Sequence, residues 1–235
     1  MIRKRILISF GLLVIASIPF ALFLYQNLIN VHSDSNDYIH EWLTNPESRD
    51  GLNTESACED APFILPTTGL IGLLYRDVAR PYSGLSRHTG IDVFGDGEPG
   101  SVPIVAAYDG YLTRLDDWKS TVIIRHDDPL NPGEVIWTYY THMASLNGET
   151  SYIVDDFPPG TTDEFVAQGT LLGYQGEYNG ASFGIAMHLH FSIVKTDSDG
   201  SFKNEAVLNN TIDPSPYFGL PLNMDDDAPR PIRCG

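Results

Sequence analysis

The chain has 235 residues, of which 42% are hydrophobic, so it is long enough to bury the core of one main domain. Its formal net charge is −17 at pH 7. This excess of acidic residues argues against a nucleic-acid partner, because a phosphate backbone would be repelled. It argues equally against adhesion to other anionic surfaces.

The N-terminal segment contains an apolar run, Ile6–Tyr25, with no charged residue. A helix of that length spans about 30 Å, which is the thickness of a bilayer core. The three basic residues before it, at positions 3–5, should stay on the cytoplasmic side and direct the rest of the chain outside. We therefore expect an uncleaved single-pass transmembrane helix within residues 1–26. A signal peptide cleaved after Ala16 is the alternative.

Residues 27–62 are polar and are interpreted as a membrane-proximal spacer with a short helix around Tyr38–Leu43. The sequence His40-Glu41-Trp42-Leu43-Thr44 in this segment begins like the HExxH motif of zinc proteases. Thr44 stands where that motif needs its second histidine, so we expect no metal site there.

The main domain is predicted to span residues 63–220, followed by a solvated C-terminal tail over residues 221–235. Short β-forming runs recur in this domain between turns rich in Gly, Pro, Asn and Asp, and no long amphipathic helix is present. We therefore predict a mainly β fold, an antiparallel β-sandwich or partly open barrel. The expected strands are Gly69–Tyr75, Ile104–Ala107, Gly110–Leu115, Thr121–Arg125, Val135–Tyr140, Gly169–Gly173 and His188–Val194.

Two cysteines, Cys58 and Cys234, bracket the predicted domain. If the N-terminal segment is an anchor, both lie on the oxidising side of the membrane. We expect a disulfide that joins the N-terminal arm to the C-terminal tail, with two free thiols as the alternative.

The histidines His188 and His190 are separated by one residue in an apolar, strand-like run. Side chains alternate along a strand, so both histidines project from one face while Leu189 packs behind them. Two imidazoles aimed at one place indicate metal binding or acid–base chemistry, and a pair of hydrogen-bonded core histidines is the alternative interpretation. Upstream, His88 and Asp92 add an imidazole and a carboxylate, which are ligand types of zinc. Together these two clusters can supply the three ligands that a catalytic zinc needs.

Short motifs follow one another along the predicted domain, from about Pro66 to Phe218. They are Leu65–Gly69, His88–Asp92, Val105–Gly110, Tyr140–His142, Val166–Gly173, His188–Phe191 and Asp213–Tyr217. In this order they resemble the motifs of the lysostaphin- and LytM-type zinc metalloendopeptidases, which cut the peptide part of bacterial peptidoglycan.

This resemblance implies that His88, Asp92 and His190 hold one zinc ion per chain. It implies that His142 and His188 are catalytic without binding the metal. Zinc lowers the pKa of a bound water to about 7 and polarises the scissile carbonyl, while a nearby imidazole can transfer the protons of the reaction. No HExxH glutamate is present, so a histidine must act as the base, and the sequence does not say which one.

The resemblance therefore implies a membrane-anchored zinc endopeptidase that acts on peptidoglycan stem peptides or cross-bridges outside the cytoplasmic membrane. A non-catalytic module that binds peptidoglycan or activates another hydrolase is the alternative, although such members typically lack some metal-binding residues. Residues 127–134 and 147–163 form longer loops than is usual in the family, and we expect both to border the cleft. His126, at the end of an expected strand, is predicted to have a structural or supporting role rather than to bind metal.

Overall fold

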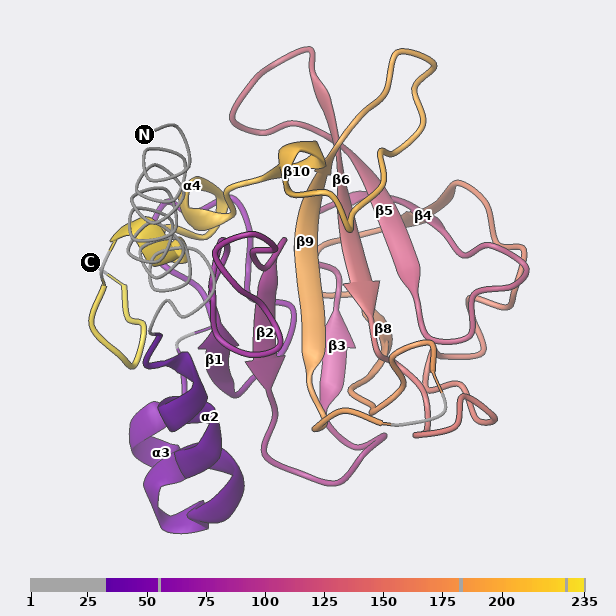
Figure 1. The fold of residues 1–235 in the computed structure, drawn as a ribbon. Coiled ribbons are helices and arrows are strands. Elements are labelled where there is room, and N and C mark those ends of the chain that lie inside the picture. Colours follow the sequence, from indigo (N-terminus) through magenta and orange to yellow (C-terminus); the bar gives the residue numbers. More distant parts are fainter. Residues whose placement is uncertain (1–32, 55, 182–183, 227, 235) are drawn as a thin grey trace, which may run out of the picture.

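The computed structural model describes residues 33–54, 56–181, 184–226 and 228–234 (Figure 1). The predicted membrane anchor, within residues 1–26, lies outside these ranges. Among the described residues, no helix has both the length and the apolar character needed to cross a bilayer.

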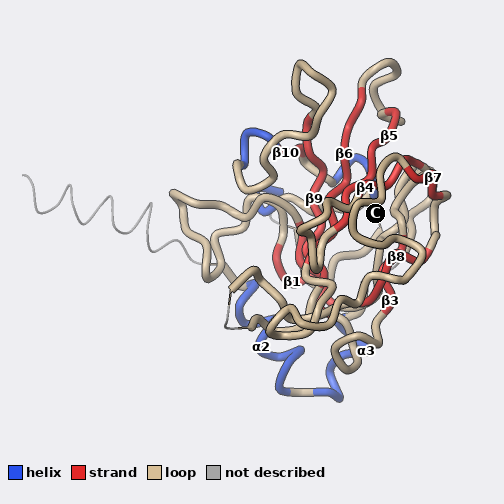
Figure 2. The backbone as a smooth tube through the Cα atoms, turned by 90° about the vertical axis from the view of Figure 1, so that its right-hand side faces the viewer, coloured by secondary structure: helices blue, strands red, loops and turns tan. Residues whose placement is uncertain are grey.

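An open antiparallel sheet is the main element of the fold, as predicted (Figures 1 and 2). Its strands follow the order β1-β2-β9-β6-β5-β4-β7, β10 also pairs with β9, and β3 pairs separately with β8. The path ends at β1 and β7, so the barrel is not closed. The strands are β1 (Leu70–Leu73), β2 (Ile91–Phe94), β3 (Pro103–Val105), β4 (Gly110–Thr113), β5 (Val122–Asp127), β6 (Val135–Thr141), β7 (Glu164–Val166), β8 (Leu171–Tyr174), β9 (Leu189–Lys195) and β10 (Thr211–Ile212).

Each of the strands expected from the sequence is present, with ends shifted by a few residues. Strands β2, β7 and β10 are not among the expected ones. They contain only four, three and two residues, but β1, β3, β4 and β8 are no longer than four residues and are among the expected strands, so length alone does not separate the two groups.

The hydrophobic core lies on one face of the large sheet. Alternation along β9 directs Leu189, Phe191 and Ile193 into it, all fully buried. The small β3–β8 sheet contributes Ile104 and Leu172 to the same core. The other face of the large sheet carries a smaller apolar cluster around Ile123, Trp137 and Val194, and the site histidines His188 and His190 also lie on that face.

Helix α2 (Ser35–Thr44) lies within the predicted spacer and includes the helix expected around Tyr38–Leu43. It packs against the sheet through Trp42, which is 1% exposed and donates from Nε1 to the carbonyl of Gly95 at 3.3 Å. In Figure 1, α2 and α3 lie together beside β1. The other helical segments are η2 (Pro46–Ser48), α3 (Arg49–Leu52), η3 (Leu208–Asn210), α4 (Ser215–Phe218) and η4 (Met224–Asp226).

The C-terminal tail packs against the domain, so the expectation of a solvated extension is wrong. Leu222 and Ile232 are 0% and 1% exposed and belong to the main core. The acidic run that suggested solvation contributes Asp225, which forms ion pairs with Arg76 and Arg87. The tail is therefore held by apolar side chains that enter the core and by a carboxylate that pairs with arginines of the β1–β2 loop.

A disulfide joins Cys58 to Cys234 across 176 residues of sequence, as predicted, with Cα atoms 5.5 Å apart. The N-terminal arm is also held by Asp77, a fully buried residue of the β1–β2 loop. Its carboxylate accepts hydrogen bonds from the hydroxyls of Ser33 and Ser35 at 2.8 and 2.5 Å. Both ends of the described chain are thereby attached to the β-domain.

Candidate functional site

Two of the predicted metal ligands, Asp92 and His190, lie on neighbouring strands. They are directly opposite each other in the antiparallel β2–β9 pair. Their neighbours Leu189 and Phe191 point into the core, so alternation places Asp92 and His190 on the other face of the sheet. Register and alternation together bring a carboxylate and an imidazole to the same place.

The third predicted ligand, His88, comes from the loop between β1 and β2 and is fully buried. Its Nδ1–H donates to the carbonyl of Leu74 at 2.9 Å, which leaves the lone pair on Nε2. The backbone N–H of His88 donates to the carbonyl of Asp77 at 3.0 Å, so the loop is held at this residue as well. Tyr82 packs its ring against the imidazole with centroids 4.8 Å apart.

Three ligand atoms converge at the cluster: Nε2 of His88, Oδ1 of Asp92 and Nδ1 of His190. They lie 3.1 Å (His88–Asp92), 3.0 Å (His88–His190) and 2.8 Å (His190–Asp92) apart. Without a metal, a proton on Nδ1 of His190 can be shared with Oδ1 of Asp92 as an ion pair. The far nitrogens of both imidazoles donate their protons away from the cluster. When the proton between His190 and Asp92 is lost, two nitrogens and one carboxylate oxygen present lone pairs to one place, and such a donor set could hold a metal ion and suits zinc.

The other two predicted site histidines, His142 and His188, lie beside this cluster with ring centroids 4.7 Å apart. The Nδ1–H of His142 donates to the carbonyl of Tyr178, and that of His188 to the carbonyl of Ala186, both at 2.7 Å. Each ring therefore carries its lone pair on Nε2. Nε2 of His188 is 3.5 Å from Oδ2 of Asp92, which places it next to the ligand cluster.

His142 follows the last residue of β6 and has φ = 76°, in the left-handed region that is uncommon for residues other than glycine. Backbone strain of this kind costs on the order of 1–3 kcal/mol and is often found at functional sites. Because of this backbone conformation, the His142 imidazole does not follow the alternation of side chains along β6 and lies against His188 instead.

Burial keeps both of these histidines neutral at pH 7. Burial, with the neighbouring His188 and His190 rings, lowers the pKa of His142 to about 3. The pKa of His188 is also lowered, mainly by burial, although the Asp92 carboxylate opposes the shift. Both rings therefore present a free lone pair on Nε2 at pH 7, while the same burial makes each of them a weaker base than a histidine in water.

The carboxylates of the site remain ionised. Burial alone would raise the pKa of Asp92, but the imidazoles of His88 and His188 and hydrogen bonds to the ligand histidines hold it well below its ordinary value. Burial likewise opposes ionisation of Glu205, but its pairing with His190 lowers the pKa of Glu205 to about 2. Burial opposes protonation of His190, but the Glu205 and Asp92 carboxylates raise its pKa to about 10, so without a metal its imidazole carries a positive charge between them.

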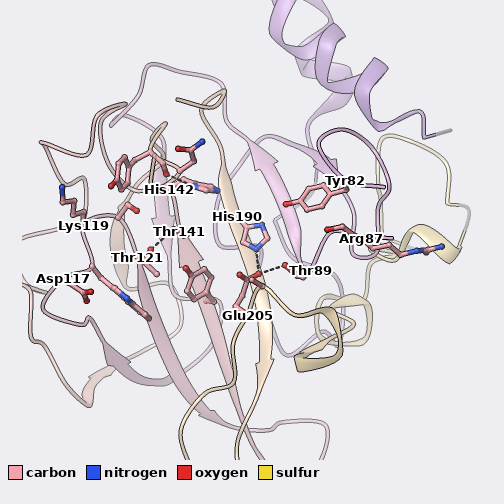
Figure 3. Close-up of a pocket in the computed structure, with 18 residues that line it drawn as sticks. Tyr82, Arg87, Thr89, Asp117, Lys119, Thr121, Thr141, His142, His190 and Glu205 are labelled. Atoms are coloured by element: carbon pink, nitrogen blue, oxygen red, sulfur yellow. Dashed lines mark hydrogen bonds and ion pairs between the residues drawn. The ribbon is translucent and has the colours of Figure 1, made fainter. Parts of the chain in front are cut away.

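A cleft of about 510 Å³ opens over this face of the sheet (Figure 3). Its floor is formed by Tyr139 and Thr141 of β6 and by Thr121, the residue before β5. His190, His142 and Glu205 line the cleft near the ligand cluster, and Lys119 and Asp117 lie at one end of it.

Residues 127–134 do not line this cleft, so the expectation that they border it is wrong. Residues 147–163 do not line it either, but Gly148 packs against the ring of Tyr178, which does. Residues 117–121 and 178–180 border it instead. His142 follows the C-terminal end of β6, whereas the 127–134 loop precedes the N-terminal end. A strand of seven residues separates the two ends by about 20 Å.

Sequence reasoning missed Glu205 and Tyr82, which both line the cleft. Glu205 belongs to an irregular polar loop between β9 and β10 and has no neighbouring motif. Tyr82 lies six residues before His88 in the β1–β2 loop, where no spacing rule singles it out. Burial, together with the charges of Asp92 and Glu205, raises the pKa of Tyr82, so its phenol keeps its proton and can donate a hydrogen bond into the cleft.

His126 lies outside the site and is 1% exposed. Its Nδ1–H donates to the carbonyl of Asp109, and its Nε2 is 2.7 Å from the hydroxyl of Thr138. These contacts make it a hydrogen-bonded histidine of the protein interior, in agreement with the structural role expected for it.

No family model and no curated protein matches the sequence. Among solved structures, the chain is similar to the antimicrobial peptidase lysostaphin from Staphylococcus simulans, with 20% identity over 56% of this chain and 43% of that one, and a TM-score of 0.36. It is also similar to a LytM structure from Ruminococcus gnavus, with 20% identity over 69% and 61% of the two chains and a TM-score of 0.41. Lysostaphin and LytM are the peptidases that the sequence motifs resemble.

A third similar structure is a zinc containing peptidase from Vibrio cholerae, with 15% identity over 66% of this chain and 34% of that one, and a TM-score of 0.32. The chain spans less than two thirds of each of these three structures. What this chain does must therefore be argued from its own side chains.

Proposed function

We propose that this chain is a zinc-dependent endopeptidase of the lysostaphin/LytM type, which hydrolyses peptide bonds in peptidoglycan stem peptides or cross-bridges. The observation that carries the proposal is the convergence of three ligand atoms, from His88, Asp92 and His190, at the edge of the cleft. Two further imidazoles stand next to them and are held neutral by burial.

His88, Asp92 and His190 would hold the zinc ion, one per chain. When bound, the metal supplies Lewis acidity that polarises a carbonyl and lowers the pKa of a water molecule. The side chains prepare this site because each ligand imidazole already has its proton on the nitrogen that faces away from the cluster.

His142 and His188 would transfer the protons of the hydrolysis. One of them takes the proton of the attacking water on Nε2, and a protonated imidazole then gives a proton to the leaving amine. Their Nδ1–H groups are fixed on the carbonyls of Tyr178 and Ala186, so both rings keep Nε2 available for this exchange. Burial favours the return of each ring to its neutral form after the proton has passed.

We also propose that the domain works outside the cytoplasmic membrane, attached through the N-terminal apolar segment. Two features support this location: the basic residues that precede Ile6–Tyr25, and the disulfide between Cys58 and Cys234. Disulfides persist in oxidising compartments and are rare in the cytosol. Peptidoglycan is also found only on that side of the membrane.

The proposal is tested by measuring zinc content and wall digestion on the same preparation. We expect one zinc per chain by elemental mass spectrometry, and new amino groups with a matching set of released peptides when purified peptidoglycan is treated. Removal of the metal with a chelator should stop the release, and added zinc should restore it. A zinc-loaded protein that leaves all wall peptides intact would contradict the proposal, and binding to the wall without cleavage would favour a non-catalytic module.

A further inference from the structure

Glu205 is the one acidic side chain of the cleft that contacts a ligand histidine on its far side. Its Oε1 is 2.8 Å from Nε2 of His190, while Nδ1 of His190 faces the ligand cluster (Figure 3). The carboxylate comes from the loop between β9 and β10, fifteen residues after His190. Its side chain is only 18% exposed, so the contact is shielded from water.

The same carboxylate oxygen accepts a second hydrogen bond. The hydroxyl of Thr89 donates to Oε1 of Glu205 at 2.5 Å. Thr89 directly follows the ligand His88 in the loop before β2. Glu205 therefore connects the β9–β10 loop to the segment that carries His88 and Asp92, and is itself held in position from that segment.

The contact decides which nitrogen of His190 can bind a cation. A neutral imidazole carries one proton and one ligating lone pair, so ligation through Nδ1 requires the proton on Nε2. The carboxylate of Glu205 can only accept, and it lies where that proton must be. The Nδ1–H of His88 donates to the carbonyl of Leu74, which is neutral. Of the two groups that accept the outer proton of a predicted ligand histidine, Glu205 is therefore the one with a carboxylate.

We propose that Glu205 is a positioning residue of the metal site: it holds His190 in the tautomer that ligates through Nδ1, and it adds a second negative charge to that of Asp92. The proposal rests on the metal site of the proposed function. Loss of such a contact typically weakens metal binding by about 10–100-fold.

The test compares zinc affinity in three variants of the full chain, measured by competition with a chromogenic chelator. Glu205→Ala removes both the acceptor and the charge and should weaken zinc binding about 10–100-fold. Glu205→Gln keeps an acceptor oxygen but removes the charge, so its affinity should lie between wild type and Glu205→Ala. Asp117→Asn removes a carboxylate from the far end of the same cleft and should bind zinc as wild type does.

A second readout follows the geometry of the site directly. The visible absorption spectrum of the cobalt-substituted protein depends on how the ligands are arranged, and it should change in Glu205→Ala but not in Asp117→Asn. Zinc affinity within about twofold of wild type together with an unchanged cobalt spectrum in Glu205→Ala would overturn the proposal. Glu205→Gln as tight as wild type would overturn the role of the charge, and Glu205→Gln as weak as Glu205→Ala would overturn the orienting role.

These outcomes are independent of peptide hydrolysis. If wild type binds zinc in a Glu205-dependent way but cuts no wall peptide, the proposed function fails and the role of Glu205 stands. If wild type cuts wall peptides with zinc and Glu205→Ala binds zinc equally well, only the role of Glu205 fails. Should Glu205→Ala not fold, Glu205→Gln is compared with wild type: equal zinc affinity would overturn the role of the charge, and a changed cobalt spectrum would overturn the orienting role of the acceptor oxygen.

Discussion

Asp92 and His190 face each other across the β2–β9 pair, with Oδ1 and Nδ1 only 2.8 Å apart. Two residues 98 positions apart in the chain thus supply two of the three residues of the cluster through a single strand pairing. The cluster therefore depends on the alignment of β2 with β9.

Replacement of any ligand should remove the metal. We expect His88→Ala, Asp92→Ala and His190→Ala to lose most of their zinc, since a missing ligand weakens binding and leaves the remaining groups without a shared cation. His40→Ala, which removes an exposed histidine of α2, should keep its zinc. Elemental mass spectrometry on dialysed protein measures both, and an Asp92→Ala variant with full metal content would rule out this ligand set.

His142 and His188 should be needed for turnover but not for metal. General acid–base catalysis is worth about 10²–10⁴-fold, so His142→Asn and His188→Ala should lose that factor in kcat, equivalent to about 3–5 kcal/mol. Asparagine is chosen at position 142 because it tolerates the positive φ found there. Both variants should keep most of their zinc. If His188→Ala loses its metal, the roles of His188 and His190 have been exchanged.

Stability should rise with pH between about 4 and 6.5 because of His126. Burial lowers its pKa to about 4 in the folded protein, whereas an unfolded histidine titrates near pH 6.5. In that window the unfolded chain binds more protons, so His126 contributes an increase in the free energy of unfolding of at most about 1.4 kcal/mol per pH unit, to which His142 and His188 add in the same direction. Urea unfolding at several pH values should show a smaller slope for His126→Gln than for wild type. Equal slopes would mean that His126 does not titrate in this way.

The disulfide between Cys58 and Cys234 should stabilise the fold without affecting the site. It closes a loop across 176 residues, for which the chain-entropy model allows about 5 kcal/mol, although measured values are often smaller. A Cys58→Ser, Cys234→Ser double variant should therefore have a lower Tm and unchanged zinc content at 25 °C. A reducing agent should lower the Tm of wild type to that of the double variant and leave the double variant unchanged.

The N-terminal segment should keep the protein in the membrane. In cell fractionation we expect the full-length chain in the membrane fraction, and an external protease should degrade its domain in cells whose membrane is intact. A mature protein that begins after Ala16 or Ala21 and appears in the medium would show that the segment is a cleaved signal peptide.

The sequence predicts those parts of the structure that have local causes. Alternation over seven residues identifies β6 and β9, and the spacing of His188 and His190 places them on one face. The motif resemblance adds His88, Asp92 and His142 to the same site. These features can be recognised because each one is set by a few consecutive residues.

Features that depend on distant contacts could not be predicted. Glu205 becomes significant only because the β9–β10 loop folds back onto Thr89 and His190. The tail looked solvated because of its acidic residues, yet Ile232 enters the core and Arg230 donates to the carbonyl of Gly72. The polar composition of the tail indicates which of its side chains are solvated. It does not indicate which apolar side chains between them pack against residues that are distant in the sequence.

Because Asp92 and His190 face each other, metal binding at this site would depend on the correct alignment of β2 with β9. A slip of one residue between β2 and β9 would turn one of the two side chains into the core and bring Leu189 or Phe191 into its place. Only the native alignment can then present a complete ligand set. A chain that has paired these strands in the wrong register would thus remain metal-free. Metal occupancy would then distinguish correctly folded molecules from misaligned ones before substrate binds.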